Sequence, residues 1–306
     1  MDNFLTVGQQ VLILFVLVLV GFVLGKKDVI TDKGGKVCSD LALLIATPCV
    51  IINSFQREYS PEVLRELLIA LLVAVGLHVL AIALTHIVYR KDDPTSRVYR
   101  TSTVLSNAGF MGLPLQQALL GARGVMYGAT YVVMMSVTMW SYGLLIMNRS
   151  EGKIPVKKMV FSPGVIGLVV GLLLFVCRIT LPELLASPVK SLGALNTPLP
   201  MVFTGYYLAK IDMKKAFKNR SMYGAMVMRL IVVPIISAAL MYVCGVRGDM
   251  LISMTVAASA PTAVAVAMFA DRYRQDAETA VNLVSISTLL SVVTMPVIVS
   301  VVQTIA

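Results

Sequence analysis

The sequence predicts an all-α integral membrane protein with ten transmembrane helices in two inverted five-helix repeats. Three observations predict this fold class: an apolar composition, a series of uncharged runs long enough to cross a bilayer, and interruptions at matching places in the two halves. Of the 306 residues, 58% are hydrophobic and only 14% are charged, and the mean hydropathy is +0.84. A soluble domain of this length is far less apolar.

Ten runs with few or no charges are the expected spans, and most reach the roughly 20 residues that cross a hydrocarbon core. The second run is short and is completed at the membrane interface by residues 36–40. The first run has an acidic start and no small-residue cleavage site, so we expect a span and not a signal peptide. The spans are Asn3–Gly25, Leu41–Gln56, Leu67–Tyr89, Thr101–Ala122, Gly124–Asn148, Met159–Cys177, Ser191–Ala209, Ser221–Val246, Met250–Ala270 and Thr279–Ala306.

Lysines and arginines favour one side of this arrangement. Most fall in the loops after the odd-numbered spans, within residues 26–36, 90–100, 149–158, 210–220 and 272–274. The other side holds Arg57, Arg65, Arg123, Arg178, Lys190 and Arg247. Because positive loops stay cytoplasmic, both termini are predicted on the extracytoplasmic side of the cell membrane. The short basic loops also account for the net charge of +10 without a nucleic-acid partner.

The two halves, residues 1–150 and 151–306, carry matching marks. Five spans precede the polar segment 148–158 and five follow it, so a duplicated second half enters the membrane inverted. Thr47-Pro48 in the second span matches Thr197-Pro198 in the seventh, and SNAGFMGLPL in the fourth matches ASAPTAVAV in the ninth. A single Pro or Gly is tolerated as an ordinary kink. The paired marks instead predict that Pro114 and Pro261 break the fourth and ninth helices near their middles.

Two broken helices that cross near the bilayer midplane bring freed backbone groups and two helix N-termini together, which favours a bound anion. Backbone that is not helical at this depth has to line a cavity or be buried in protein. Helix packing through small residues is the alternative role for Gly112 and Ser106. The candidate substrate-binding residues are Ser106, Asn107, Gly109, Gly112, Pro114, Ser259, Pro261, Thr262 and Arg229.

Two other polar residues lie inside predicted spans. Arg229 is about eight residues into the eighth span, so we expect it to face a substrate carboxylate or its entry path, or to reach the cytoplasmic headgroups with its long side chain. His78 is a candidate proton relay, and packing within the bundle is the alternative. His78 and His86 have no third ligand nearby and the four cysteines stand singly, so neither a metal site nor a disulfide is predicted.

The NAGFMGLPL of the fourth span and the APTAVAVAMFADRY of the ninth resemble the auxin efflux carrier family over essentially the whole chain. Bacterial members transport small organic anions, and plant members are the PIN auxin carriers, whose long central loop this sequence lacks. The resemblance implies an elevator-like arrangement, in which spans 1, 2, 6 and 7 form a scaffold, often dimeric, and spans 3–5 and 8–10 form a transport domain. It also implies that Asn107 and Pro114 belong to the first crossover element and Pro261 to the second.

The sequence thus predicts a secondary active or facilitative transporter of small organic anions, mono- or dicarboxylates, and not an enzyme. Its expected partners are the lipid bilayer, the anion and a second copy of the chain. No cofactor is predicted, and coupling to H⁺ or Na⁺ stays open because the acidic residues fall in loops or at span ends. The alternative is a membrane sensor or scaffold that retains a transporter fold. A channel lacks its filter residues here, and a hydrolase lacks its nucleophile or metal cluster.

Overall fold

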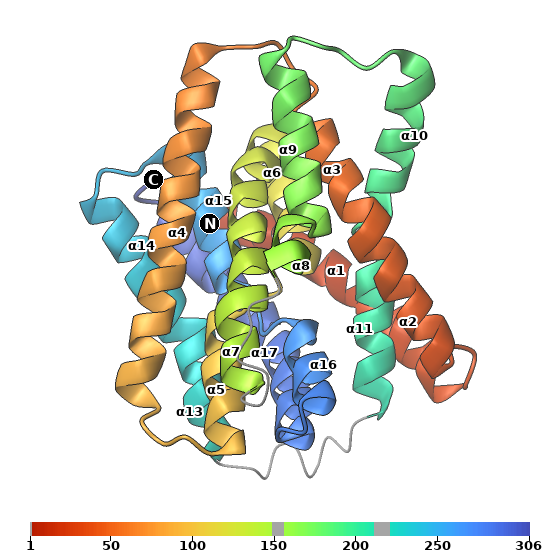
Figure 1. The fold of residues 1–306 in the computed structure, drawn as a ribbon, viewed down its shortest axis with the longest axis vertical. Helices are drawn as coiled ribbons and strands as arrows, with labels where there is room; N and C mark the ends of the chain where they lie inside the picture. The colour runs from red at the N-terminus through yellow and green to blue at the C-terminus, as the bar shows by residue number, and fades with distance from the viewer. Residues whose placement is uncertain (1, 149–155, 211–220) are drawn as a thin grey trace.

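The computed structural model describes residues 2–148, 156–210 and 221–306, which are almost entirely helical (Figure 1). Within these ranges the one β-type pairing is an isolated bridge between Ser106 and Thr262. Six helical runs of the described residues are long and apolar enough to cross a membrane, which supports an all-α integral membrane protein. They are Val7–Lys26, Lys33–Ser54, Pro61–Val88, Ala108–Met147, Met222–Val243 and Ala277–Gln303.

Within each described range the helices follow one another with short connections. They are α1 (Asp2–Lys26), α2 (Asp32–Leu41), α3 (Thr47–Ser54), α4 (Pro61–Val88), α5 (Pro94–Val104), α6 (Leu113–Thr138), α7 (Leu144–Met147), α8 (Val156–Val160), α9 (Pro163–Val176), α10 (Glu183–Ala194), α11 (Pro198–Lys210), α13 (Ser221–Val227), α14 (Val233–Val243), α15 (Gly248–Ser259), α16 (Val264–Arg272) and α17 (Ala277–Gln303). Four π-helical turns join some of them: η1 (Ala42–Ala46), η2 (Ala108–Gly112), η3 (Met139–Gly143) and η4 (Met228–Val232).

The predicted count of ten spans depends on segments that are short or interrupted. The run Ala108–Met147 has 40 residues, which at 1.5 Å per residue is about twice the thickness of the hydrocarbon core. Its helix departs from helical geometry at Gly121, where φ is +62° and ψ is −151°, a conformation that glycine adopts readily. The ten-span inverted repeat stays a prediction. Several basic residues used to predict the orientation lie outside the described residues: Arg149, Lys153, Lys214, Lys215, Lys218 and Arg220.

Three of the π-helical turns directly precede an X-Pro pair. Proline has no N–H, and its ring would strike the carbonyl four residues earlier in an α-helix. A π-turn widens the helix at that point, because each N–H bonds to the carbonyl five residues back. The Leu113 N–H, for example, bonds to the Ala108 carbonyl directly before Pro114. The other two pairs are Thr47-Pro48 after η1 and Val233-Pro234 after η4.

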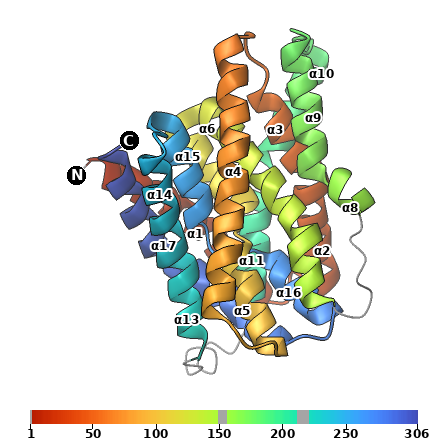
Figure 2. The same cartoon turned by 60° about the vertical axis from the view of Figure 1, so that its left-hand side comes forward.

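The helices pack as two groups. In one, α1 packs along α11, and α3 packs against α9 and α10. In the other, α6 packs against α4 and α15, while α17 packs against α15 and α16. Figures 1 and 2 both place α10 far from α14, on opposite sides of the molecule. The groups meet where α1 contacts α17 and where α3 and α9 contact α6.

Two glycines allow α1 and α11 to approach closely. A Cβ at Gly21 would lie 1.9 Å from the carbonyl oxygen of Val202, and a Cβ at Gly205 would lie 1.9 Å from that of Val18. Neither obstacle is a flexible side chain, so an added methyl group has to push the helix backbones apart. Close contact through small residues is a common way for helices to associate in lipid.

We expect Gly205→Ala to lower the free energy of unfolding by ~1–3 kcal/mol, the usual range for overpacking. The measurement is the melting temperature of the purified protein in detergent. The matched control is Gly76→Ala in α4, where an added Cβ meets open space, and this variant should be unchanged or slightly more stable because alanine favours the helix. Equal melting temperatures for the two variants would contradict the close α1–α11 contact.

Candidate functional site

The two interrupted segments lie side by side. The chain leaves α5 through Leu105 and Ser106, and it leaves α15 through residues 260–263. These extended segments run antiparallel, with the Asn107 N–H donating to the Pro261 carbonyl (2.7 Å) and the Ala263 N–H donating to the Leu105 carbonyl (2.9 Å). Backbone groups that the broken helices free therefore bond to each other, as a site away from water requires. We call this pair of segments the crossing.

The two interruptions have different local geometry. Ala260 has a ψ of 148°, the extended conformation that the following Pro261 imposes. In the other segment the interruption lies at residues 105–107, whereas Pro114 stands beyond η2, within the first turn of α6. The prediction that Pro114 breaks the fourth span is wrong, because the π-turn accommodates this proline within a continuous helix.

Arg229 binds the carbonyl ends of both interrupted helices. Its guanidinium donates to the Thr103 carbonyl at the end of α5 (2.9 Å), and to the carbonyls of Ala258 (2.6 Å) and Ala260 (2.9 and 3.0 Å) at the end of α15. The residue is only 1% exposed. Its positive charge thus offsets the negative ends of two helix dipoles. The guanidinium is bonded to backbone carbonyls in this structure, and a role of Arg229 toward substrate stays a prediction.

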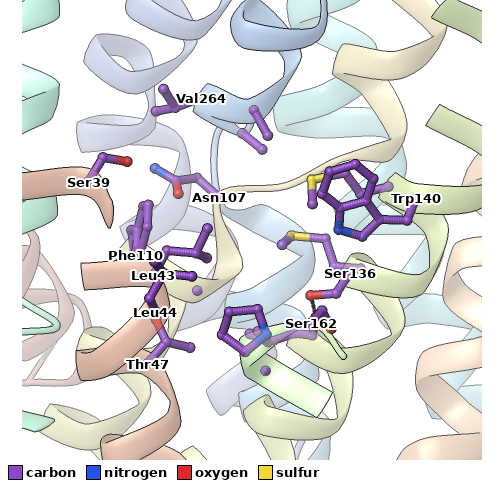
Figure 3. A pocket seen from close by; sticks show the side chains of 18 of the residues that line it. Ser39, Leu43, Leu44, Thr47, Asn107, Phe110, Ser136, Trp140, Ser162 and Val264 are labelled. Atoms are coloured by element: carbon purple, nitrogen blue, oxygen red, sulfur yellow. Dashed lines mark hydrogen bonds between the residues drawn. The ribbon is translucent and has the colours of Figure 1, made fainter. Parts of the chain in front are cut away.

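A cavity of about 310 Å³ lies beside the crossing (Figure 3). Its polar lining residues are Ser39, Thr47, Ser106, Asn107, Ser136 and Ser162. The larger apolar lining residues are Leu43, Leu44, Phe110, Val132, Met135, Met139, Trp140, Phe161, Pro163, Val264 and Met268. Among the described residues, no charged side chain lines it. We call this space the crossing cavity.

Two helices that leave the crossing begin at the crossing cavity, and α9 also begins there, after Ser162. The run η2–α6 starts after Asn107, and α16 starts after Ala263. At neither start does a side chain of the capping residue bond to the first N–H groups. Such groups have no acceptor within the helix and carry the positive end of its dipole. Since Gly109 and Val264 in these first turns line the cavity, two positive helix ends converge on it.

Buried polar atoms without a partner also face this space. The Nδ2 of Asn107 and the hydroxyls of Ser106 and Ser162 have no hydrogen-bond partner, although these side chains are at most 4% exposed. Figure 3 shows the Asn107 amide directed toward the side of the cavity where Ser39 lies. Unpaired buried polar groups are costly and uncommon. Their presence around one cavity indicates a place for a polar ligand group.

Other predicted site residues support the crossing without lining the cavity. The Ser259 hydroxyl donates to a carbonyl of its own helix (3.1 Å), and the Thr262 N–H donates to the Ser287 Oγ (3.1 Å). Gly112 packs near Ala257, whose Cα would lie 3.6 Å from an added Cβ. This is the helix-packing role considered for Gly112 as the alternative.

His78 also lies outside the residues that line the crossing cavity. Its ring centroid is 4.6 Å from that of Tyr131, and its Nδ1 is 2.8 Å from the Ala74 carbonyl oxygen. The ring is therefore packed between α4 and α6. A path from this histidine to the cavity stays a prediction.

Sequence reasoning missed several lining residues. Ser39, Ser136, Trp140 and Ser162 come from three separate stretches of the chain and carry no motif. Two weak signals could have found part of this set: Trp140 is the single tryptophan of the sequence, and the hydroxyl residues interrupt otherwise apolar runs. Thr47 stood out only as half of a Thr-Pro pair.

Comparisons with known proteins show the family of this chain. A family model described as "Membrane transport protein" matches residues 6–158 and 152–299. A protein of Methanothermobacter thermautotrophicus, named an uncharacterized transporter, is 23% identical over 294 residues, covering 94% of this chain and 96% of the relative. A second uncharacterized transporter, from Methanocaldococcus jannaschii, is 24% identical over 297 residues, covering 92% of this chain and 94% of the relative.

We expect Arg229→Ala to destabilise the protein by ~3 kcal/mol or more, because it leaves several buried carbonyls without donors. Methylguanidinium at millimolar concentration should restore part of the lost melting temperature by filling the vacated space. Arg247→Ala is the matched control, because Arg247 also donates to backbone carbonyls but from an exposed position. A stable Arg229→Ala protein, or equal rescue of both variants, would contradict the capping role.

Proposed function

Because the chain belongs to the membrane transport protein family, the auxin efflux carrier family, we propose that it is a secondary active or facilitative transporter of small organic anions. The substrate class is mono- or dicarboxylates. The observation that carries this proposal is the crossing cavity, on which two uncapped helix N-termini converge and which no acidic side chain lines among the residues that the structure describes. Helix N-termini bind carboxylates and phosphates through their N–H groups and dipoles.

The lining favours acids with an apolar body. A volume of about 310 Å³ is at the lower end for small-molecule sites. Phe110, Trp140 and Phe161 supply aromatic surface, while Asn107 and Ser106 supply donors close to the helix ends. A carboxylate at the helix ends with a hydrocarbon or ring against these walls satisfies both parts of the lining. A second carboxylate would lie against apolar walls, which disfavours it.

The position of Arg229 favours transport without sodium. In transporters with broken helices, unwound carbonyls and C-terminal helix ends commonly hold the coupling cation. Here the corresponding carbonyls of Thr103, Ala258 and Ala260 bond to a fixed guanidinium. We therefore propose that the Arg229 guanidinium takes the place of a coupling ion at the C-terminal ends of α5 and α15.

The proposed mechanism is elevator-like alternating access. The group containing α1, α3 and α9–α11 is the proposed scaffold, and the group containing α4–α6 and α14–α17 is the proposed transport domain; the two meet where α1 contacts α17 and where α3 and α9 contact α6. This assignment extends to ten spans in two inverted repeats, residues 1–150 and 151–306. We further propose a homodimer through the scaffold in the cell membrane, with both termini on the extracytoplasmic side.

The first test is uptake of radiolabelled acids into proteoliposomes, with pH and sodium gradients imposed one at a time. We expect saturable uptake of a monocarboxylate with an apolar body, and no response to sodium. Sodium-dependent uptake would refute the proposed role of Arg229 as a substitute cation. If no acid moves although the protein stays folded, the transport proposal fails, and a sensor that retains a transporter fold becomes the better account.

The second test concerns Asn107. Asn107→Ala removes a buried donor at the crossing cavity, and we expect uptake at low substrate concentration to fall roughly tenfold, the effect of one lost hydrogen bond. Leu72→Ala is the control, since Leu72 is 71% exposed on α4 and faces outward. Wild-type uptake by a folded Asn107→Ala protein would remove this residue from the proposed site.

A further inference from the structure

Asn196 lies in the short turn between α10 and α11 and is only 2% exposed. Its Oδ1 accepts a hydrogen bond from the Thr47 hydroxyl (2.8 Å), and its Nδ2 donates to the Gly109 carbonyl (3.1 Å). A carbonyl only accepts, so the Nδ2 has to face Gly109 and the Oδ1 has to face Thr47. This amide therefore joins three segments that are distant in sequence. We call these hydrogen bonds the Asn196 bridge.

The Gly109 carbonyl needs this external donor for a local reason. Within a π-turn its acceptor role would be filled by the residue five positions later, which is Pro114, and proline has no N–H. The N–H of Leu113, which would serve in an α-helix, is bonded to Ala108 instead. Pro114 thus leaves the buried Gly109 carbonyl without a donor from its own helix, and the Asn196 Nδ2 donates to this carbonyl instead.

A second cavity, of about 250 Å³, lies on the other side of this bridge. It is lined by Val50, Asn53, Leu113, Pro114, Gln117, Lys190, Gly193, Ala194, Asn196 and Thr197. We call it the far cavity, and it shares no lining residue with the crossing cavity. Thr47 in α3 and Gly109 in η2 line the crossing cavity. About one helical turn further along the same elements, Val50 and Leu113 line the far cavity. The bridge therefore occupies the boundary between the two spaces.

The cavities approach opposite ends of the helices. The crossing cavity reaches Phe161 and Ser162 at the start of α9, whereas the far cavity reaches Asn53 near the end of α3 and Lys190 in α10. Figure 1 shows α10 rising toward the top of the molecule, while α16, which lines the crossing cavity, lies in its lower part. Lys190 gives the far cavity a positive charge, which suits the approach of an organic anion from that end.

We propose that the Asn196 bridge is the gate between the two cavities. Asn196 is a positioning residue that holds η2–α6 where it blocks passage from the crossing cavity to the far cavity. This proposal rests on the proposed transport function. For substrate to pass to the far side, the Gly109 carbonyl has to leave Asn196 as the η2–α6 element slides along α3. The bridge joins neutral groups, so it is weak enough to break and reform in each cycle.

The experiment measures access directly and does not need a substrate. The four native cysteines, Cys38, Cys49, Cys177 and Cys244, are first replaced by alanine. One reporter is then introduced, either Ser136→Cys in the crossing cavity or Ala194→Cys in the far cavity. Intact cells are treated with a membrane-impermeant thiol reagent, which reaches the protein from the side predicted for the far cavity. The readout is the labelling rate at each reporter.

With the bridge intact, we expect the Ala194→Cys reporter to be labelled much faster than the Ser136→Cys reporter. Asn196→Leu keeps the volume but removes both hydrogen bonds, so labelling at the Ser136→Cys reporter should rise at least tenfold. Thr47→Val keeps the shape and removes only the hydroxyl, and it should give a smaller rise. Asn53→Leu is the matched control, because Asn53 lines the far cavity outside the bridge, and it should leave the rate unchanged.

Unchanged labelling of the Ser136→Cys reporter in both Asn196→Leu and Thr47→Val would overturn the gate, and so would an equal rise in Asn53→Leu. If Asn196→Leu does not fold, Thr47→Val alone decides the outcome. The result is independent of the substrate assignment, because labelling responds to the gate even if no carboxylate is transported. Failure of the uptake test with a positive labelling result would refute the substrate and keep the gate.

Discussion

The backbone of two interrupted helices has to find hydrogen-bond partners at a depth where lipid offers none. The rest of the structure depends on how this constraint is met. The two extended segments bond to each other through the N–H groups of Asn107 and Ala263. The carbonyls at the ends of α5 and α15 accept from Arg229. The Gly109 carbonyl accepts from Asn196. At the helix N-termini beside the cavity, within the described part of the chain, the side chains of the capping residues Asn107 and Ala263 make no capping hydrogen bond.

This division separates the two ends of the helix dipoles. A fixed cation is placed against the negative ends, and the positive ends are directed into a space lined largely by apolar side chains. A low local dielectric strengthens any charge interaction within such a space. The proposed anion would therefore be held by backbone dipoles that need no rearrangement when it arrives, with no arginine or lysine among the described lining residues.

Local sequence signals predicted the membrane class, the pairing of two interrupted segments and the position of Asn107 at their crossing, because composition and helix-breaking residues act over short distances. They misplaced the first interruption at Pro114, since whether a proline breaks a helix or sits behind a π-turn is decided by how neighbouring helices pack. Arg229 was recognised as anomalous, but its partners lie about 30 and 126 residues away. Trp140 and Ser162 joined the cavity for the same reason: their proximity is created by tertiary packing and leaves no local pattern.

The proposed transport of an anion without a coupling ion has an electrical consequence. The protein's own charges return to their starting positions after a full cycle, so the net charge moved is that of the substrate. Such transport is electrogenic, and a potential of 100 mV acts on each charge with ~2.3 kcal/mol. For a cell that is negative inside, this corresponds to a roughly fifty-fold concentration ratio of a monoanion in favour of the outside. In the proposed mechanism, membrane potential alone suffices to drive export, without a second ion.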